Sequence, residues 1–245
     1  MEKTKVICVV HGDYSRTGRI GDNIRAKGFE EVRYCLPTGD ELPTDFDGVA
    51  GAIVFGGPMS ANDDDKLDFI AKELRWIDKL TAADVPFLGV CLGAQMLARV
   101  LGAEVKPHDE GWHEIGFCKI APTEAGRDVI GDLRYVYHWH GEGFDMPAGA
   151  EHLAVGASGH FPNQAYRIGE RIYGVQFHPE CTLEMIEMWT KEGAENLSEP
   201  GAQQPHEQIA GAKRYDHLVD AWVPGFLDTW LGLESREFEV RSAAS

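Results

Sequence analysis

The thiol of Cys91 is the side chain whose local sequence points most directly to chemistry. It lies in Gly89–Gln95, where the pattern Gly-x-Cys-x-Gly is typical of a nucleophile elbow, a sharp turn from a strand into a helix. Gly89 and Gly93 are small enough for the backbone to pass close to itself at such a turn. The N-terminus of the helix would direct its N–H groups at the sulfur and favour the thiolate. The segment therefore predicts a nucleophilic cysteine.

A base and an orienting carboxylate follow later in the chain. His178 directly follows an apolar run, Ile172–Phe177, that we expect to be a strand. Glu180 stands two residues after His178. Glu180 is placed to accept the ring N–H of His178 and so to fix its tautomer. Taken alone, Cys91 is equally compatible with a buried, inert thiol. The presence of His178 and Glu180 favours the catalytic interpretation.

Together with Phe55–Pro58, the segments Gly89–Gln95 and Gly174–Glu180 resemble the class I (triad) glutamine amidotransferases. The resemblance is greatest to the glutaminase domain of GMP synthetase and its stand-alone relatives, and it extends from about Val6 to about Glu187. In that family a cysteine attacks the side-chain amide of glutamine, forms a γ-glutamyl thioester and releases ammonia. No metal or organic cofactor takes part in this half-reaction.

The resemblance implies a role for each matching residue. The triad would be Cys91, His178 and Glu180, and the oxyanion hole would use the backbone N–H groups of Gly57 and Leu92. Gln95 matches a position that helps to hold the substrate. These residues would convert glutamine, or a related γ-glutamyl compound, to glutamate.

A looser match lies in Tyr137–Glu142, which resembles the Ser-His-Gly-Asp stretch that recognises the glutamine head group in enzymes of the GMP synthetase type. Trp139 stands in place of the serine, and Glu142 in place of the aspartate. We expect His140, Gly141 and Glu142 to bind substrate. Glu142 keeps a negative charge for an α-ammonium group, but on a longer side chain.

His138 and His140 admit two other interpretations, as hydrogen-bonded strand residues or as metal ligands. Because no carboxylate or cysteine stands at ligand spacing beside them in the sequence, we predict no metal. We expect the segment from His108 to Glu114 to be a solvated loop beside the pocket. The acidic run Asp63–Asp65 is interpreted as the N-terminal part of a helix rather than as a calcium loop.

Three functions remain open at this point. The first is a glutaminase whose ammonia goes to an acceptor made by another polypeptide, because the chain has no Ser-Gly-Gly-x-Asp-Ser pyrophosphate loop. The second is a γ-glutamyl peptidase on the same fold, and the third is a non-catalytic binding module. A synthetase subunit and a second copy of the chain are the protein partners that we consider.

Composition narrows the class of protein. The chain has 245 residues with 43% hydrophobic content, enough for a sizeable core, and a formal net charge of −17 that argues against nucleic acid and anionic membranes as partners. No apolar run is long enough to cross a membrane, and the N-terminus reads as a first strand rather than as a signal peptide. Five scattered cysteines favour a reducing cytoplasm.

The elements that must position these residues alternate between apolar runs and amphipathic stretches, which predicts an α/β fold. We expect a flavodoxin-like, doubly wound, mostly parallel sheet with added antiparallel hairpins between Gly102 and Gln176, and a C-terminal helical extension. The predicted parallel strands before Cys91 are Lys5–Val10, Glu31–Leu36, Val49–Phe55 and Pro86–Val90. The predicted helices are Lys66–Leu80 and, after the elbow, Gln95–Leu101.

The last part of the chain lies outside the resemblance. We predict an amidotransferase domain over residues 1–196 and a helical extension over 197–245 that packs on it. One helix should start near Thr182, and a second should cover about Glu207 to Leu231, broken or kinked at Pro224 and Gly225. Residues 234–245 are expected to be frayed.

Overall fold

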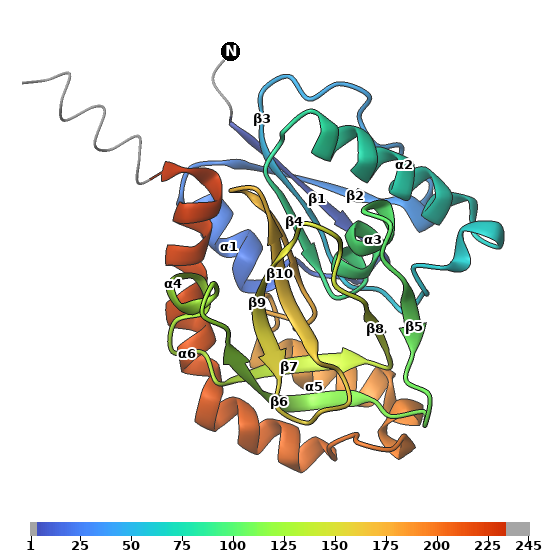
Figure 1. Cartoon of the computed structure of the whole chain (residues 1–245), viewed down its shortest axis with the longest axis vertical. Helices are drawn as coiled ribbons and strands as arrows, with labels where there is room; N and C mark the ends of the chain where they lie inside the picture. The colour runs from blue at the N-terminus through green and yellow to red at the C-terminus, as the bar shows by residue number, and fades with distance from the viewer. Residues whose placement is uncertain (1–3, 234–245) are drawn as a thin grey trace, which may run out of the picture.

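A nine-stranded sheet forms the centre of the computed structural model, which describes residues 4–233 (Figure 1). The strand order is β2-β1-β3-β4-β11-β10-β9-β6-β7. The parallel part consists of β2 (Glu30–Cys35), β1 (Lys5–Val10), β3 (Val49–Val54), β4 (Phe87–Val90) and β11 (Ile172–Val175). The antiparallel part consists of β10 (Asn163–Ile168), β9 (Glu151–Gly156), β6 (Glu114–Pro122) and β7 (Tyr135–His140).

Helices cover both faces of the parallel strands (Figure 1). On one face lie α2 (Asp68–Ala82) and α3 (Leu92–Val100), and on the other lie α1 (Gly18–Ala26) and α6 (Pro205–Leu231). The remaining elements are α4 (Arg127–Ile130), α5 (Leu183–Glu192), three 3₁₀ turns at Leu36–Thr38, Asp63–Asp65 and Ala194–Ser198, and a small antiparallel sheet of β5 (Val105–Pro107) and β8 (Glu142–Phe144).

The alternation of side chains along β1 explains this layering. Val6, Cys8 and Val10 pack into the cluster that includes residues of α1 and α6, whereas Ile7 and Val9 pack into the cluster that includes residues of α2 and α3. Successive side chains of a strand point to opposite faces, so an entirely apolar strand requires cover on both sides. The predicted α/β fold, a mostly parallel sheet with antiparallel strands added, is confirmed.

The starts of two helices differ from the prediction. Helix α3 begins at Leu92 rather than at Gln95, because the strand turns into the helix within the single residue Cys91. The acidic residues Asp63–Asp65 do not cap α2; they form a separate 3₁₀ turn, and the extended conformation of Leu67 (φ −124°, ψ 100°) divides that turn from the helix.

Helix α6 is continuous through Pro224, so of the two outcomes predicted there, a break or a kink, the break is wrong. A proline removes one N–H donor and crowds the preceding turn, but it does not prevent a helix whose apolar face is held on both sides. Buried side chains lie on both sides of the proline in the sequence: Val219 and Val223 before it, and Phe226 and Trp230 after it. Tertiary packing therefore outweighs the local preference of proline here. The residues predicted to fray, 234–245, lie outside the described residues.

Within residues 4–233, none of the helices combines the length and the apolar character that a membrane crossing requires.

Candidate active site

Cys91 sits at the turn between β4 and α3 in a strained backbone conformation. Its φ of 52° and ψ of −106° lie in a region that residues with a Cβ rarely adopt. The flanking glycines make this turn possible: a Cβ on Gly89 would lie 2.5 Å from the Gly93 backbone, and a Cβ on Gly93 would lie 2.0 Å from the Val54 carbonyl oxygen. Such close contacts exclude any larger residue, as expected for a nucleophile elbow.

The sheet brings His178 and Glu180 to the same edge. Strands β4 and β11 are parallel neighbours with Val90 opposite Val175, so their carboxyl ends lie side by side. Two residues separate His178 from the end of β11. Its Nδ1 lies 2.7 Å from Glu180 Oε1, which indicates that the ring N–H donates to the carboxylate. This bond fixes the tautomer and orientation of the ring.

The surroundings of His178 fix its ring and raise its pKa. Burial disfavours its charged form, but Glu180 and Cys91 outweigh this effect and raise the pKa of His178 to about 10. The Trp189 ring meets the imidazole edge-on at a centroid distance of 4.9 Å. The other ring nitrogen, Nε2, is buried and has no hydrogen-bond partner among the described residues. It is therefore free to exchange a proton with a group at this site.

The Cys91 sulfur lies among polar groups rather than in an apolar pocket. Its Sγ is 3.9 Å from the Trp139 carbonyl oxygen, and the Gln176 side-chain amide donates to it at 3.5 Å. A bond from an N–H group to sulfur favours the negatively charged form. Among the described residues Cys91 and His178 Nε2 form no hydrogen bond, and such bonds often tighten only when substrate is bound.

The two backbone groups predicted for an oxyanion hole flank Cys91. Gly56 packs directly against the site, because a Cβ on it would lie 2.6 Å from His178 Cε1 and 3.6 Å from Cys91 Cβ. The next residue, Gly57, donates its N–H to no hydrogen bond among residues 4–233. Leu92 is the first residue of α3, where N–H groups have no partner within the helix.

The structure also brings the predicted substrate-binding residues together. The Gln95 side-chain amide and the His140 Nδ1–H both donate to the Glu142 carbonyl oxygen, at 2.9 Å each. Gly141 joins His140 to Glu142 and packs against the His113 ring. The Glu142 carboxylate accepts a bond of 2.8 Å from the Ser60 hydroxyl. Ser60 is three residues beyond Gly57, so this carboxylate lies close to the predicted oxyanion loop.

One premise of the sequence interpretation was wrong. Glu114 is buried rather than part of a solvated loop, and it lies beside His138 and His140, although no carboxylate stands at ligand spacing beside them in the sequence. Glu114 Oε2 is 3.3 Å from His140 Nε2 and 3.8 Å from His138 Nδ1. Burial works against its charge, but His140, His138 and Ser158 prevail and lower the pKa of Glu114 to about 2. Contacts with His140, His138 and Ser158 therefore keep this buried carboxyl ionised.

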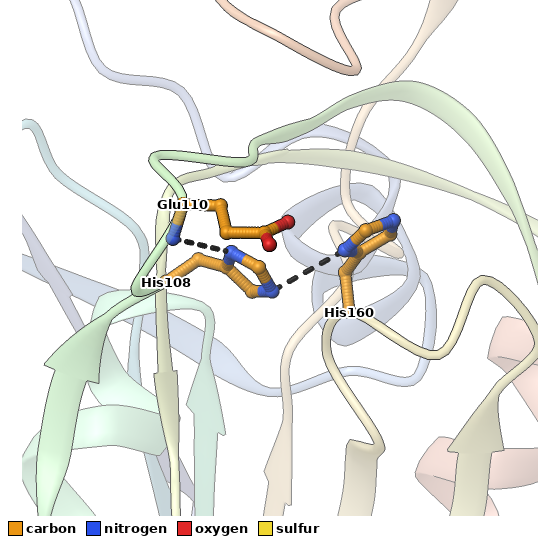
Figure 2. A group of neighbouring side chains, drawn as sticks. All are labelled: His108, Glu110 and His160. Atoms are coloured by element: carbon orange, nitrogen blue, oxygen red, sulfur yellow. Dashed lines mark hydrogen bonds between the residues drawn. The ribbon is translucent and has the colours of Figure 1, made fainter.

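A second group of titratable side chains lies nearer the surface, where Figure 2 shows His108, Glu110 and His160 facing one another. The Glu110 N–H donates to His108 Nδ1, and His108 Nε2 is 3.2 Å from His160 Nδ1. A metal ion on Nε2 of neutral His108 would require a proton on Nδ1, facing the Glu110 N–H. The hydrogen bonds therefore fit two neutral histidines better than a pair of metal ligands.

Several side chains at the site were missed from the sequence. Ser60 and Trp189 lie outside the motifs, so no pattern in the sequence connects them with the site. Gln176 lies inside the motif Gly174–Glu180, which was the one signal that could have identified it. The buried pair His11 and Glu73 had no such signal, because the two residues are far apart in the sequence.

Comparison of sequences identifies similar proteins. A family model described as glutamine amidotransferase class-I matches residues 28–189. The chain is 35% identical over 152 residues to a GMP synthase (glutamine-hydrolyzing) of Porphyromonas gingivalis, a match that covers 58% of this chain and only 27% of that protein. It is 28% identical over 222 residues to the glutamine amidotransferase-like protein YfeJ of Salmonella typhimurium, covering 87% of this chain and 91% of that one. The chain thus spans about a quarter of the synthase but nearly the whole of YfeJ.

Comparison of structures gives a consistent result. A glutamine amidotransferase from Thermotoga maritima superposes with a TM-score of 0.85 at 25% identity, covering 94% of this chain and 99% of that one. A glutamine amido transferase from Methylobacillus flagellatus superposes with a TM-score of 0.84 at 26% identity, covering 95% of each chain. Both similarities include the C-terminal region that the sequence resemblance did not reach.

Proposed function

Because this chain belongs to the class I glutamine amidotransferases, we propose that it hydrolyses the side-chain amide of glutamine through a thioester on Cys91. The observation that carries the proposal is the meeting of three groups at one sheet edge. These are a cysteine held in a strained turn at a helix N-terminus, a histidine with a free buried nitrogen, and a carboxylate 2.7 Å from that histidine. Neither a binding module nor a structural domain requires this combination.

The first step would be attack of the Cys91 sulfur on the amide carbon. Because the pKa of His178 is about 10, the proton of the Cys91 thiol would already reside on Nε2 before attack, and Glu180 would stabilise this imidazolium through Nδ1–H. The amide oxygen becomes an oxyanion as the carbon becomes tetrahedral. The N–H groups of Gly57 and Leu92 would receive it, assisted by the positive end of the α3 dipole.

The second step would be departure of ammonia. The Cys91 contribution that helps to raise the pKa of His178 is lost when the sulfur is acylated, so His178 becomes a stronger acid at the moment when the leaving nitrogen needs a proton. Neutral His178 then removes a proton from water, which attacks the thioester carbon. The products are glutamate and the free thiol, and the residues return to their starting state.

We assign the α-amino acid end of the substrate to the region around Glu142. Its carboxylate supplies the negative charge that an α-ammonium group requires, and its backbone is fixed by Gln95 and His140. The hydrogen bond from Ser60 holds the longer side chain of Glu142 towards the oxyanion loop.

The ammonia would pass to an acceptor enzyme on a separate polypeptide. The match to GMP synthase covers only 27% of that protein. A synthetase subunit is therefore the partner that we propose. Recovery of such a subunit with the native protein, together with faster ammonia release in its presence, would test this assignment.

The test of the hydrolytic function is ammonia release from glutamine by the purified chain. We expect measurable release, complete loss in Cys91→Ala, and little change in Cys118→Ala, a matched control at a half-buried cysteine in β6 away from the elbow. A diazoketone analogue of glutamine should label Cys91, as read by mass spectrometry of peptides. Faster cleavage of γ-glutamyl dipeptides than of glutamine would instead assign the chain as a peptidase. Absence of both activities and of labelling would refute an enzymatic role.

A further inference from the structure

His11 packs against the predicted oxyanion loop, Gly56–Gly57. It follows the last residue of β1, and its side chain is fully buried. The Nδ1 atom lies 3.0 Å from the Gly56 carbonyl oxygen. Gly57 rests on the same ring, because a Cβ on Gly57 would lie 2.7 Å from His11 Cβ and 3.1 Å from Nδ1. His11 therefore contacts both residues of the Gly56–Gly57 peptide.

The opposite side of this peptide faces the reacting groups. Gly56 lies against His178 and Cys91, so the Gly56–Gly57 segment is enclosed between His11 below and the proposed nucleophile and base above. In a trans peptide the C=O and the following N–H point in opposite directions, and the described residues contain no cis peptide bond. A carbonyl turned towards His11 thus turns the Gly57 N–H away from His11.

His11 is itself held by a buried carboxylate on α2. Its Nε2 lies 3.1 Å from Glu73 Oε2, and both side chains have no exposed surface. The Gly56 carbonyl can only accept a hydrogen bond, so Nδ1 must carry a proton. An imidazolium donating to both oxygens satisfies the geometry, and Glu73 raises the pKa of His11 against the effect of burial. A positive charge then lies on the far side of the peptide whose N–H would meet the oxyanion.

We propose that His11, fixed by Glu73, is a positioning residue that locks the Gly56–Gly57 peptide with its N–H directed at the oxyanion formed beside Cys91. This inference rests on the proposed glutamine hydrolysis and adds the residue that follows β1 and one residue of α2 to the groups that support that reaction. His11 acts through the peptide and does not touch the substrate.

The proposal predicts a specific division between binding and chemistry. The groups assigned to the substrate head, Gln95 and Glu142, are not bonded to His11, so ground-state binding should change little. Loss of one oxyanion donor typically lowers kcat by about 10²–10³-fold. We therefore expect kcat to fall by about this factor when the Gly56 carbonyl loses its donor, with KM within about threefold of the parent value.

Two double variants isolate the hydrogen bond from the ion pair. In His11→Leu/Glu73→Met the buried charges are replaced by apolar side chains of similar volume, which avoids an unpaired charge and protects the fold. His11→Asn/Glu73→Met has nearly the same shape but keeps an N–H donor for the Gly56 carbonyl. Far-UV circular dichroism and thermal unfolding would first establish that both variants are folded.

The decisive measurement compares these variants with two ligands. Glutamate γ-semialdehyde adds to Cys91 as a thiohemiacetal with an oxyanion, whereas the diazoketone reports on the thiol itself. We expect the leucine variant to lose about 10²-fold in semialdehyde affinity while Cys91 is still labelled, and the asparagine variant to recover at least tenfold in both kcat and semialdehyde affinity. Equal kcat in the two variants, or a leucine variant with the parent kcat, would overturn the inference. Failure of the parent protein to release ammonia or to be labelled would instead overturn the proposed function.

Discussion

Gly56→Ala tests how closely the loop and the base are packed. Gly56 does not occupy the left-handed backbone region, so an alanine meets no conformational obstacle there. Its effect should be steric, because the added Cβ would lie 2.6 Å from His178 Cε1, where ordinary contact begins at 3.4 Å. Either the imidazole or the loop must therefore move by about 0.8 Å.

Neither the His178 imidazole nor the loop can move without affecting the reaction. His178 is held by Glu180 on one side and by the Trp189 ring on another, and the loop is held by His11. A displacement of about 1 Å between reacting groups costs about 10²-fold in rate. We expect kcat for ammonia release to fall by about 10²-fold, and the free energy of unfolding to fall by about 1–3 kcal/mol, as for other overpacked sites.

Gly225→Ala is the matched control for the same change of residue. Gly225 lies inside α6, and its added Cβ meets no atom within 4 Å. Alanine is favoured over glycine in a helix by about 1 kcal/mol, so this variant should be slightly more stable and fully active. The assay is steady-state ammonia release with thermal unfolding of each variant. A Gly56→Ala enzyme that keeps more than a third of the parent kcat would refute the close packing of loop and base.

Two further predictions concern stability. Pro224→Ala should raise the free energy of unfolding by about 1–3 kcal/mol, because it restores an N–H donor inside a continuous helix. Urea unfolding would measure this change. A lower free energy of unfolding would mean that α6 depends on the proline. The pKa of His178 lies at about 10 in the folded state and near 6.5 in the unfolded state, so its contribution to stability should be complete below about pH 6.5 and should disappear as pH rises towards 10. Thermal unfolding across this range should show the difference between the parent and Glu180→Gln shrinking with pH, and a constant difference would contradict the assigned pairing.

The sequence was informative wherever a local pattern had only one structural solution. The uninterrupted apolar run of β1 predicts a strand buried on both faces, and its bounds agree with the structure. The spacing of glycines around Cys91 predicts the elbow, because only that turn needs both of them. Fold class follows from such local signals, since alternating strands and helices have few ways to pack.

Prediction failed where distant residues decide the outcome. Glu114 looks like part of a polar loop from its neighbours, yet it accepts hydrogen bonds from Ser158 and Gln164, which lie on another part of the chain. Those partners make burial of its charge tolerable, and nothing adjacent to Glu114 indicates them. Pro224 gave the opposite error, because a local rule was trusted where packing on both sides of the residue prevails.

In the three closest carboxylate–histidine pairs of the described residues, one ring nitrogen lies next to a carboxylate oxygen. The pairs differ in what the other ring nitrogen contacts. His11, His140 and His178 each have a carboxylate oxygen within 3.3 Å. The second nitrogen of His11 donates to the Gly56 carbonyl, and that of His140 donates to the Glu142 carbonyl, so each of these rings fixes a backbone segment. Burying paired charges stabilises a fold weakly at best, so a positioning role is a better reason for them than stability.

Only His178 among these three rings has its second nitrogen buried and unpartnered. A ring that already donates to a carbonyl has no free site for a proton from a thiol, whereas His178 has one, next to Cys91. The same residue type therefore serves two purposes at this site according to what its second nitrogen meets. Two histidines hold the loops that would receive the oxyanion and the substrate head, and the third is left free to move the proton.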